Sequence, residues 1–273
     1  MPIQLVLFGI LFILGLTGCQ LGRNFQEQQI SETSAEVSAP DSTADTTAPI
    51  TSPSPTAAPT PSPIPPTSEE LAQASQARQL GLEYRNQERY DEAISELKKS
   101  VTLDPQNLSG HVILGWTLHL AGQRAEAKQA LQQALIQDES HVPALNALGI
   151  VYLVDGDLEQ AVKTHTQALE LKPDNEIAHY NLSLAYHRLA DYDQAISHAI
   201  RATELEPENP HPWVALSIIY WSQEETALAQ QAYQQALALD ERYYDAGFLS
   251  YLKQAGFSTP QIQTTNDVRI DAI

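Results

Sequence analysis

The chain has 273 residues, and its 34 acidic and 15 basic side chains give a formal net charge of −19. With 42% hydrophobic residues, this composition predicts a globular or repeat protein with an acidic surface. Because such a surface repels a phosphate backbone and the sequence has no cluster of Lys and Arg, we expect no nucleic acid partner.

The first predicted element is an apolar N-terminal run. Residues 3–16 are almost entirely apolar and lead into Leu-Thr-Gly-Cys, which ends at Cys19, the only cysteine of the chain. A run of about 14 residues spans only roughly 21 Å as a helix, shorter than the ~30 Å hydrocarbon core, so it predicts a signal peptide rather than a membrane span. One cysteine also excludes an intrachain disulfide bond and a cysteine zinc site.

This N-terminus resembles the lipobox of bacterial lipoproteins. The resemblance implies that residues 1–18 are a signal peptide that is cleaved, and that Cys19 carries the lipid. The domain would then lie outside the cytoplasm, on the periplasmic side, anchored to the cell membrane or the outer membrane. An uncleaved hydrophobic anchor is the alternative, because residues 1–4 lack the basic side chain expected at the start of a signal peptide.

Residues 19–68 form the next predicted part, a linker. Pro, Ser and Thr dominate it, most clearly in residues 53–66. Too few large apolar side chains are present to offset the entropy of ordering, so we expect disorder. A flexible coil of about 50 residues has a root-mean-square reach of roughly 40 Å and would serve as a tether.

Beyond the linker the sequence repeats every 34 residues. A small residue preceded by leucine recurs five times, an alanine follows each after twelve positions, and another small residue follows after seven more. A polar turn separates two apolar halves of each unit, which predicts two helices that cross at the small residues. The recurring small residue of the first helix is Gly81, Gly115, Gly149, Ser183 and Ser217.

These slots resemble the signature of the tetratricopeptide repeat family. The resemblance implies an all-α fold, a right-handed α-solenoid of five 34-residue helix-turn-helix repeats plus a C-terminal capping helix, within a domain of residues 69–256. We place the capping helix at 244–255, and residues 257–273 are expected to be a partly ordered tail. The predicted repeats lie near 74–107, 108–141, 142–175, 176–209 and 210–243.

In this family the first helices line a concave surface that binds peptides. Their inward side chains are predominantly apolar or aromatic from the second repeat onward, which predicts a partner-binding groove for another protein or peptide. Arg78 and Asn146 lie two repeats apart, so the pattern does not support a carboxylate clamp. The alternative is that neighbouring repeats or the chain's own tail bury this surface. The predicted groove residues are Val112, Trp116, His119, Asn146, Ile150, Tyr180, Leu184, His187, Val214, Ile218 and Trp221.

Catalysis is not expected. The sequence has no HExxH, GxSxG or GxxxxGK[ST] motif, and we predict neither a cofactor nor a metal site. His119 and His187 occupy equivalent slots two repeats apart, and His165 falls in a packing slot, which indicates a core or half-buried histidine. The sequence therefore predicts a membrane-tethered scaffold or adaptor. A structural or assembly subunit of an envelope complex and a small-molecule binding protein are the alternatives.

Overall fold

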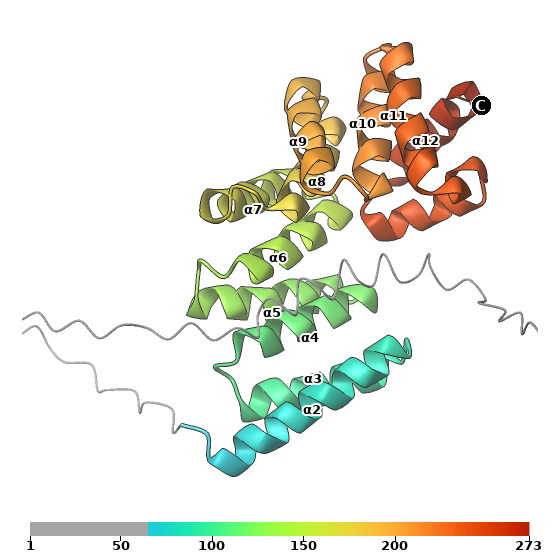
Figure 1. The fold of residues 1–273 in the computed structure, drawn as a ribbon. Coiled ribbons are helices and arrows are strands. Elements are labelled where there is room, and N and C mark those ends of the chain that lie inside the picture. Colours follow the sequence, from blue (N-terminus) through green and yellow to red (C-terminus); the bar gives the residue numbers. More distant parts are fainter. Residues whose placement is uncertain (1–64, 273) are drawn as a thin grey trace, which may run out of the picture.

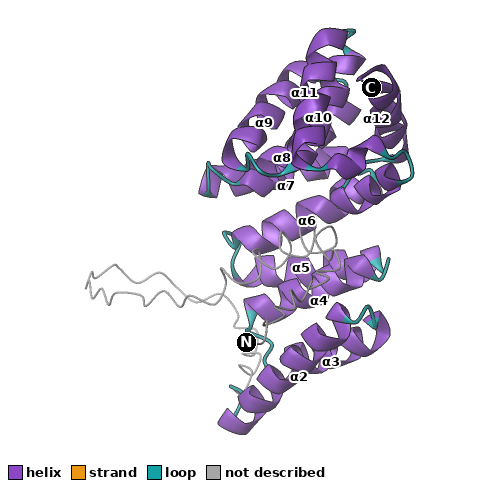
Figure 2. Cartoon of the chain, turned by 45° about the vertical axis from the view of Figure 1, so that its right-hand side comes forward, coloured by secondary structure: helices purple, strands orange, loops and turns teal. Residues whose placement is uncertain are grey.

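The computed structural model describes residues 65–272 of the chain. The predictions for the signal peptide, for Cys19 and for most of the linker lie outside these residues. Within the described part every regular element is a helix, as Figure 2 shows. None of these helices is both long and apolar enough to cross a membrane.

Ten α-helices form five antiparallel pairs that stack one on the next, from α2 and α3 at one end to α10 and α11 at the other (Figure 1). This arrangement confirms the predicted α-solenoid. The first helices of the pairs are α2 (Ser68–Asn86), α4 (Leu108–Leu120), α6 (Val142–Asp155), α8 (Glu176–Arg188) and α10 (Pro210–Ser222). The second helices are α3 (Tyr90–Leu103), α5 (Arg124–Gln137), α7 (Leu158–Leu171), α9 (Tyr192–Leu205) and α11 (Thr226–Leu239).

The first helices begin at equivalent positions because the chain places a capping side chain there every 34 residues. Asn107 accepts a hydrogen bond from the main-chain N–H of Gly110, and Asn175 accepts one from Ala178. His141 does the same with its ring nitrogen Nδ1. Each bond satisfies an N–H group that the helix itself leaves unpaired. The N-caps of α4, α6, α8 and α10 are Asn107, His141, Asn175 and Asn209.

Each pair is held tightly at the predicted small-residue slot. A Cβ atom added to Gly81 would lie 2.6 Å from Leu97, and one added to Gly115 would lie 2.6 Å from Leu131. At Gly149 it would meet the ring of His165 at 2.5 Å. Distances this short leave no room for a methyl group, so glycine lets the two helices of these pairs approach closely.

The predicted C-terminal capping helix is wrong in its position and type. Residues 244–255 do not form an α-helix, because the chain makes two 3-10 helices there, η2 (Glu241–Tyr244) and η3 (Phe248–Ala255). The tail that was expected to be partly ordered forms α12 (Thr259–Ala272), which packs against α10 and α11. Gly256, with φ of 88°, ends η3 in a left-handed conformation.

A capping box starts α12. The Ser258 N–H donates to the Gln261 side chain at 3.0 Å, while the Gln261 N–H donates to the Ser258 hydroxyl oxygen at 3.4 Å. Pro260 stands at the second helical position, where no N–H is needed. This helix was not predicted from the sequence because the apolar residues of the tail show no clear helical pattern. The Ser-x-x-Gln spacing is the signal that could have predicted its start.

Candidate functional site on the concave face

The first helices bring the predicted groove residues together on one face of the solenoid, and the structure covers most of them. Eight are buried, namely Val112, Trp116, Asn146, Ile150, Tyr180, Leu184, Val214 and Ile218. Three are half-buried, namely His119, His187 and Trp221. Most of these side chains are therefore covered in the described structure, and the face is divided into two halves with different surroundings.

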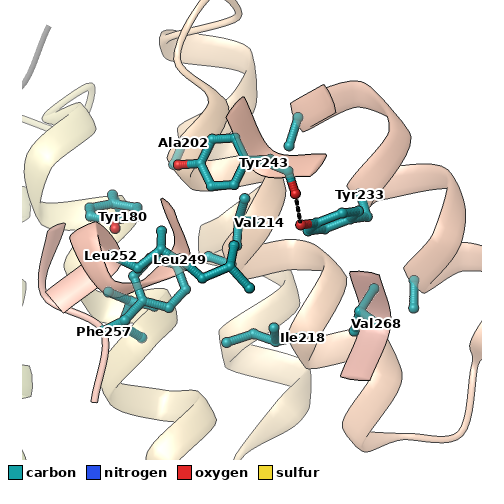
Figure 3. Close-up of a cluster of buried hydrophobic side chains, with 14 of the residues drawn as sticks. Tyr180, Ala202, Val214, Ile218, Tyr233, Tyr243, Leu249, Leu252, Phe257 and Val268 are labelled. Atoms are coloured by element: carbon teal, nitrogen blue, oxygen red, sulfur yellow. Dashed lines mark hydrogen bonds between the residues drawn. The ribbon is translucent and has the colours of Figure 1, made fainter. Parts of the chain in front are cut away.

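The half formed by α8 and α10 is covered by residues 248–272, here called the C-terminal segment. Leu249, Leu252 and Phe257 of this segment are at most 3% exposed and share a core cluster with residues of α8 and α10 (Figure 3). The Tyr180 hydroxyl donates a 2.6 Å hydrogen bond to the carbonyl oxygen of Ala255. The groove residues in this cluster are Tyr180, Leu184, Val214 and Ile218, with Trp221 packed against it.

Polar contacts fasten the start of α12 to α8. The Gln261 amide nitrogen lies 3.2 Å from the Leu184 carbonyl oxygen and 3.1 Å from His187 Nδ1. On the other side of the His187 ring, Nε2 lies 2.9 Å from the Ser222 hydroxyl, which donates its own proton to Ile218. His187 Nε2 must therefore carry the proton and Nδ1 must accept from Gln261. Burial lowers the pKa of His187 to about 4, which favours this neutral form.

A second histidine anchors the turn before the C-terminal segment. His211 Nδ1 lies 2.7 Å from the Tyr243 hydroxyl. The Tyr233 hydroxyl donates to the Tyr243 carbonyl oxygen at 2.8 Å (Figure 3). Burial lowers the pKa of His211 to about 4. η2 is thereby held against α10 and α11 before the chain turns back across the concave face.

The other half of the face, formed by α2, α4 and α6, carries buried polar nitrogens on α2 and α4 that have no hydrogen-bond partner within residues 65–272. Trp116 is 8% exposed, and its indole Nε1 has no hydrogen-bond partner there. Nδ1 of His119 and Nη1 of Arg78 are also buried without one. The Trp116 and His119 rings lie 5.0 Å apart, and burial lowers the pKa of His119 to about 4.

Asn146 serves the structure rather than a ligand. Its side-chain oxygen accepts a 2.9 Å hydrogen bond from Asn175, and its amide donates back at 3.3 Å. Both residues are at most 4% exposed. Because Asn175 also caps α8, this pair links the third repeat to the fourth, and at 4% exposure Asn146 is covered rather than presented to a carboxylate ligand.

His165 is a core histidine, as the packing slot indicated. Its side chain is 0% exposed, and neither ring nitrogen has a hydrogen-bond partner in the described part of the chain. Burial lowers its pKa to about 3, so it is neutral at pH 7. No group of three His, Cys, Asp or Glu side chains that could hold a metal ion occurs within residues 65–272.

Comparisons with known proteins agree with this geometry. A family model for the N-terminal TPR repeats region of Psidin matches residues 82–254. An uncharacterized protein of Sinorhizobium fredii, y4yS, is 28% identical over 85 residues. That match covers 31% of this chain and 47% of y4yS, so it spans about half the length of that relative.

Three solved structures share the fold. PilF of Pseudomonas aeruginosa aligns with a TM-score of 0.59 at 19% identity, over 75% of this chain and 90% of PilF. TTC0263, a TPR protein of Thermus thermophilus, gives 0.54 at 22% identity over 67% and 98% of the two chains. MamA of Desulfovibrio magneticus, solved from residue 41 to its end, gives 0.56 at 19% identity, over 62% of this chain and 96% of that solved chain. At these identities the likeness concerns the fold alone.

Proposed function

This chain belongs to the tetratricopeptide repeat family, because the family model for the N-terminal repeats of Psidin matches more than half of it. We propose that the chain is a scaffold that binds another protein through the concave face of α2, α4 and α6. Repeat solenoids of stacked helix pairs present extended concave surfaces suited to such binding. The C-terminal half of the face is already occupied by the chain itself. The N-terminal half is therefore the site that this proposal assigns to a partner.

One observation carries the proposal, namely that the buried Nε1 of Trp116 in α4 and the buried Nη1 of Arg78 in α2 have no acceptor within residues 65–272. Buried polar groups in proteins almost always have a hydrogen-bond partner, and leaving one unpaired costs about 1–3 kcal/mol. The indole Nε1 of Trp116 and Nη1 of Arg78 can only donate. In the proposed complex the side chains that cover these donors move aside, main-chain carbonyl oxygens of the partner peptide accept from them, and the Trp116 ring supplies apolar contact area. Tryptophan is enriched among the residues that dominate binding energy at interfaces.

The test separates the donor from the ring. The full chain carrying Trp116→Phe keeps an aromatic ring at the site but lacks the indole N–H. Trp213→Phe is the matched control, because Trp213 lies in α10 at the other end of the solenoid. In chemical cross-linking from a native envelope extract, a partner caught by the unmutated chain should fall at least about tenfold with Trp116→Phe and stay unchanged with Trp213→Phe.

Three results would contradict this function. Equal recovery of the partner by Trp116→Phe would remove the site from the N-terminal half of the face. Failure of the unmutated chain to cross-link any protein would favour a small-molecule ligand. Cross-linking to copies of one fixed complex at constant stoichiometry would instead favour an assembly subunit.

Tethering to a membrane through Cys19 is the second part of the proposed function. It is supported by the apolar run at 3–16 and the Leu-Thr-Gly-Cys stretch that follows it. Several acyl chains on one cysteine anchor a protein stably, whereas a single chain binds only marginally. Membrane fractionation of the full chain and of Cys19→Ser, with mass spectrometry of the mature N-terminus, tests this. Unmodified Cys19 in a membrane-bound chain would support the uncleaved anchor instead.

A further inference from the structure

We propose that the concave face of α8 and α10 is a second peptide-binding groove, and that the C-terminal segment occupies it in place of a partner peptide of the same chemistry. That chemistry can be taken from the segment itself. It consists of two leucines about one helical turn apart, an aromatic residue five positions later, and a side-chain amide four positions beyond that. In this chain the groups are Leu249, Leu252, Phe257 and Gln261.

The contacts that hold the segment are of the kinds that hold a bound peptide. Its apolar side chains enter a cluster lined by α8 and α10, at most 3% exposed, while a carbonyl oxygen receives a hydrogen bond from the Tyr180 hydroxyl. The Gln261 amide binds a groove carbonyl oxygen and a groove histidine. Apolar anchors combined with a few oriented polar contacts are typical of peptide grooves.

The segment changes direction at Gly256, which has φ of 88°. A Cβ atom there would lie at van der Waals distance from the groove, 3.5 Å from Leu184 and 3.7 Å from Leu153. The chain therefore turns sharply while lying against α8 and the end of α6. A partner peptide would need a residue that tolerates this conformation before its aromatic side chain.

The other side of the segment is weakly integrated into the fold. Tyr251 is 58% exposed and Ile270 is 62% exposed, so only one face of the segment packs. Residues 248–255 form a 3-10 helix, which has poorer hydrogen-bond geometry than an α-helix and is normally short. Burial on one face only and weak local structure are properties of elements that open more readily than the core.

The groove itself is built independently of the segment. Tyr180, Leu184, Val214 and Ile218 lie on α8 and α10, and these helices pack against their own partners, α9 and α11. Departure of the segment would leave a contiguous apolar face, and such a face on a soluble domain marks an interaction site. These observations point to a competition between the segment and a partner of like chemistry.

The experiment supplies the segment in trans. A fluorescent peptide of residues 247–272 is titrated against the full unmutated chain and against the full chain carrying Leu252→Ala and Phe257→Ala, which weakens the segment and leaves the groove intact. We expect the double variant to bind the peptide at least about tenfold more tightly than the unmutated chain. The matched control is the same peptide carrying the two alanines, which should not bind either chain.

Three results would overturn the proposal. Equal binding to both chains would mean that the peptide attaches elsewhere. A double variant that keeps its helix content by circular dichroism but binds no peptide would show that the groove does not accept the segment from outside. A double variant whose whole solenoid unfolds would make the segment an integral cap. None of these results decides whether the unmutated chain binds a partner at Trp116, because Trp116 lies in α4, at the other end of the face, and is tested by its own variant.

Discussion

The hydroxyl group of Tyr180 in α8 donates a 2.6 Å hydrogen bond to the carbonyl oxygen of Ala255, a residue 75 positions further along the chain. Both partners lie in the apolar surroundings of the cluster that also contains Leu249, Leu252 and Phe257. Burial raises the pKa of Tyr180, so the hydroxyl stays protonated and remains a donor. This bond fixes the C-terminal segment across the concave face at its sharpest turn.

Removing this hydroxyl should loosen the C-terminal segment. We expect Tyr180→Phe to lower the free energy of unfolding by about 1 kcal/mol, because the Ala255 carbonyl oxygen is left without its donor. Amide hydrogen exchange should rise mainly in residues 248–258. Tyr186→Phe, a substitution on the same helix, is the control. Unchanged exchange in that stretch with Tyr180→Phe would contradict the role assigned to the bond.

A second prediction concerns the glycine slot of the third repeat. Gly149→Ala should destabilise the fold by about 1–3 kcal/mol, because the new methyl group would overlap the His165 ring. Adding His165→Ala should recover part of this loss. The fourth repeat already carries such a combination at the equivalent positions, Ser183 and Ala199. Urea unfolding of the single and double variants measures the interaction free energy between the two positions. If the losses in unfolding free energy of the two single variants simply add up in the double variant, the positions are not in direct contact.

The buried His165 should make stability depend on pH. Its pKa is about 3 in the folded chain, below the ordinary value of 6.5, so between these values the unfolded chain binds the extra proton. Stability contributed by the neutral ring is therefore present above pH 6.5 and is lost as the pH falls from 6.5 towards 3. For this one residue the loss by pH 5 is about 2 kcal/mol.

His165→Leu tests this dependence, because leucine occupies the same slot in the first two repeats as Leu97 and Leu131. Urea unfolding at pH 7.5 and pH 5 should show a smaller loss of stability for the variant than for the unmutated chain. Other histidines whose pKa is lowered, including the half-buried His187 and His211, still contribute. An identical loss in both chains would mean that His165 is accessible to protons in the folded state.

The turns inside the repeats give a fourth prediction. Residues at the same position of all five repeats have positive φ, and only two of them are glycines. Ala190, with φ of 59°, is one of the others. Ala190→Gly should raise the melting temperature, with a gain of about 0.5–1 kcal/mol, because glycine adopts this conformation without steric cost.

Gly122→Ala is the reciprocal change. A Cβ atom at Gly122 would meet nothing within 4 Å, so any loss of stability reports on the backbone alone. We expect a loss of about 1 kcal/mol from its φ of 77°. If both substitutions shifted the melting temperature in the same direction, backbone conformation would not be the cause.

The repeat architecture could be predicted because short segments of the sequence determine it. Every 34 residues the chain repeats the small residue, the apolar face and the capping side chain that one helix pair needs, and each pair contacts mainly its neighbours. The contact of Gly115 with Leu131 follows from this pattern, and so does the burial of His165. The inward positions of Trp116 and Tyr180 could likewise be predicted from helical spacing.

What occupies the concave face was decided only by the tertiary structure. The C-terminal segment does not follow the 34-residue repeat. Its hydrogen bonds to α8 join residues far apart in the sequence, 75 positions for Tyr180 with Ala255 and 77 for Leu184 with Gln261. No local pattern encodes such contacts, because they depend on where the chain turns at Gly256 after the last repeat. The sequence by itself determined the solenoid and its inward-facing residues. Only the tertiary structure decided that the C-terminal segment covers α8 and α10, while Arg78 Nη1 and Trp116 Nε1 have no acceptor within residues 65–272.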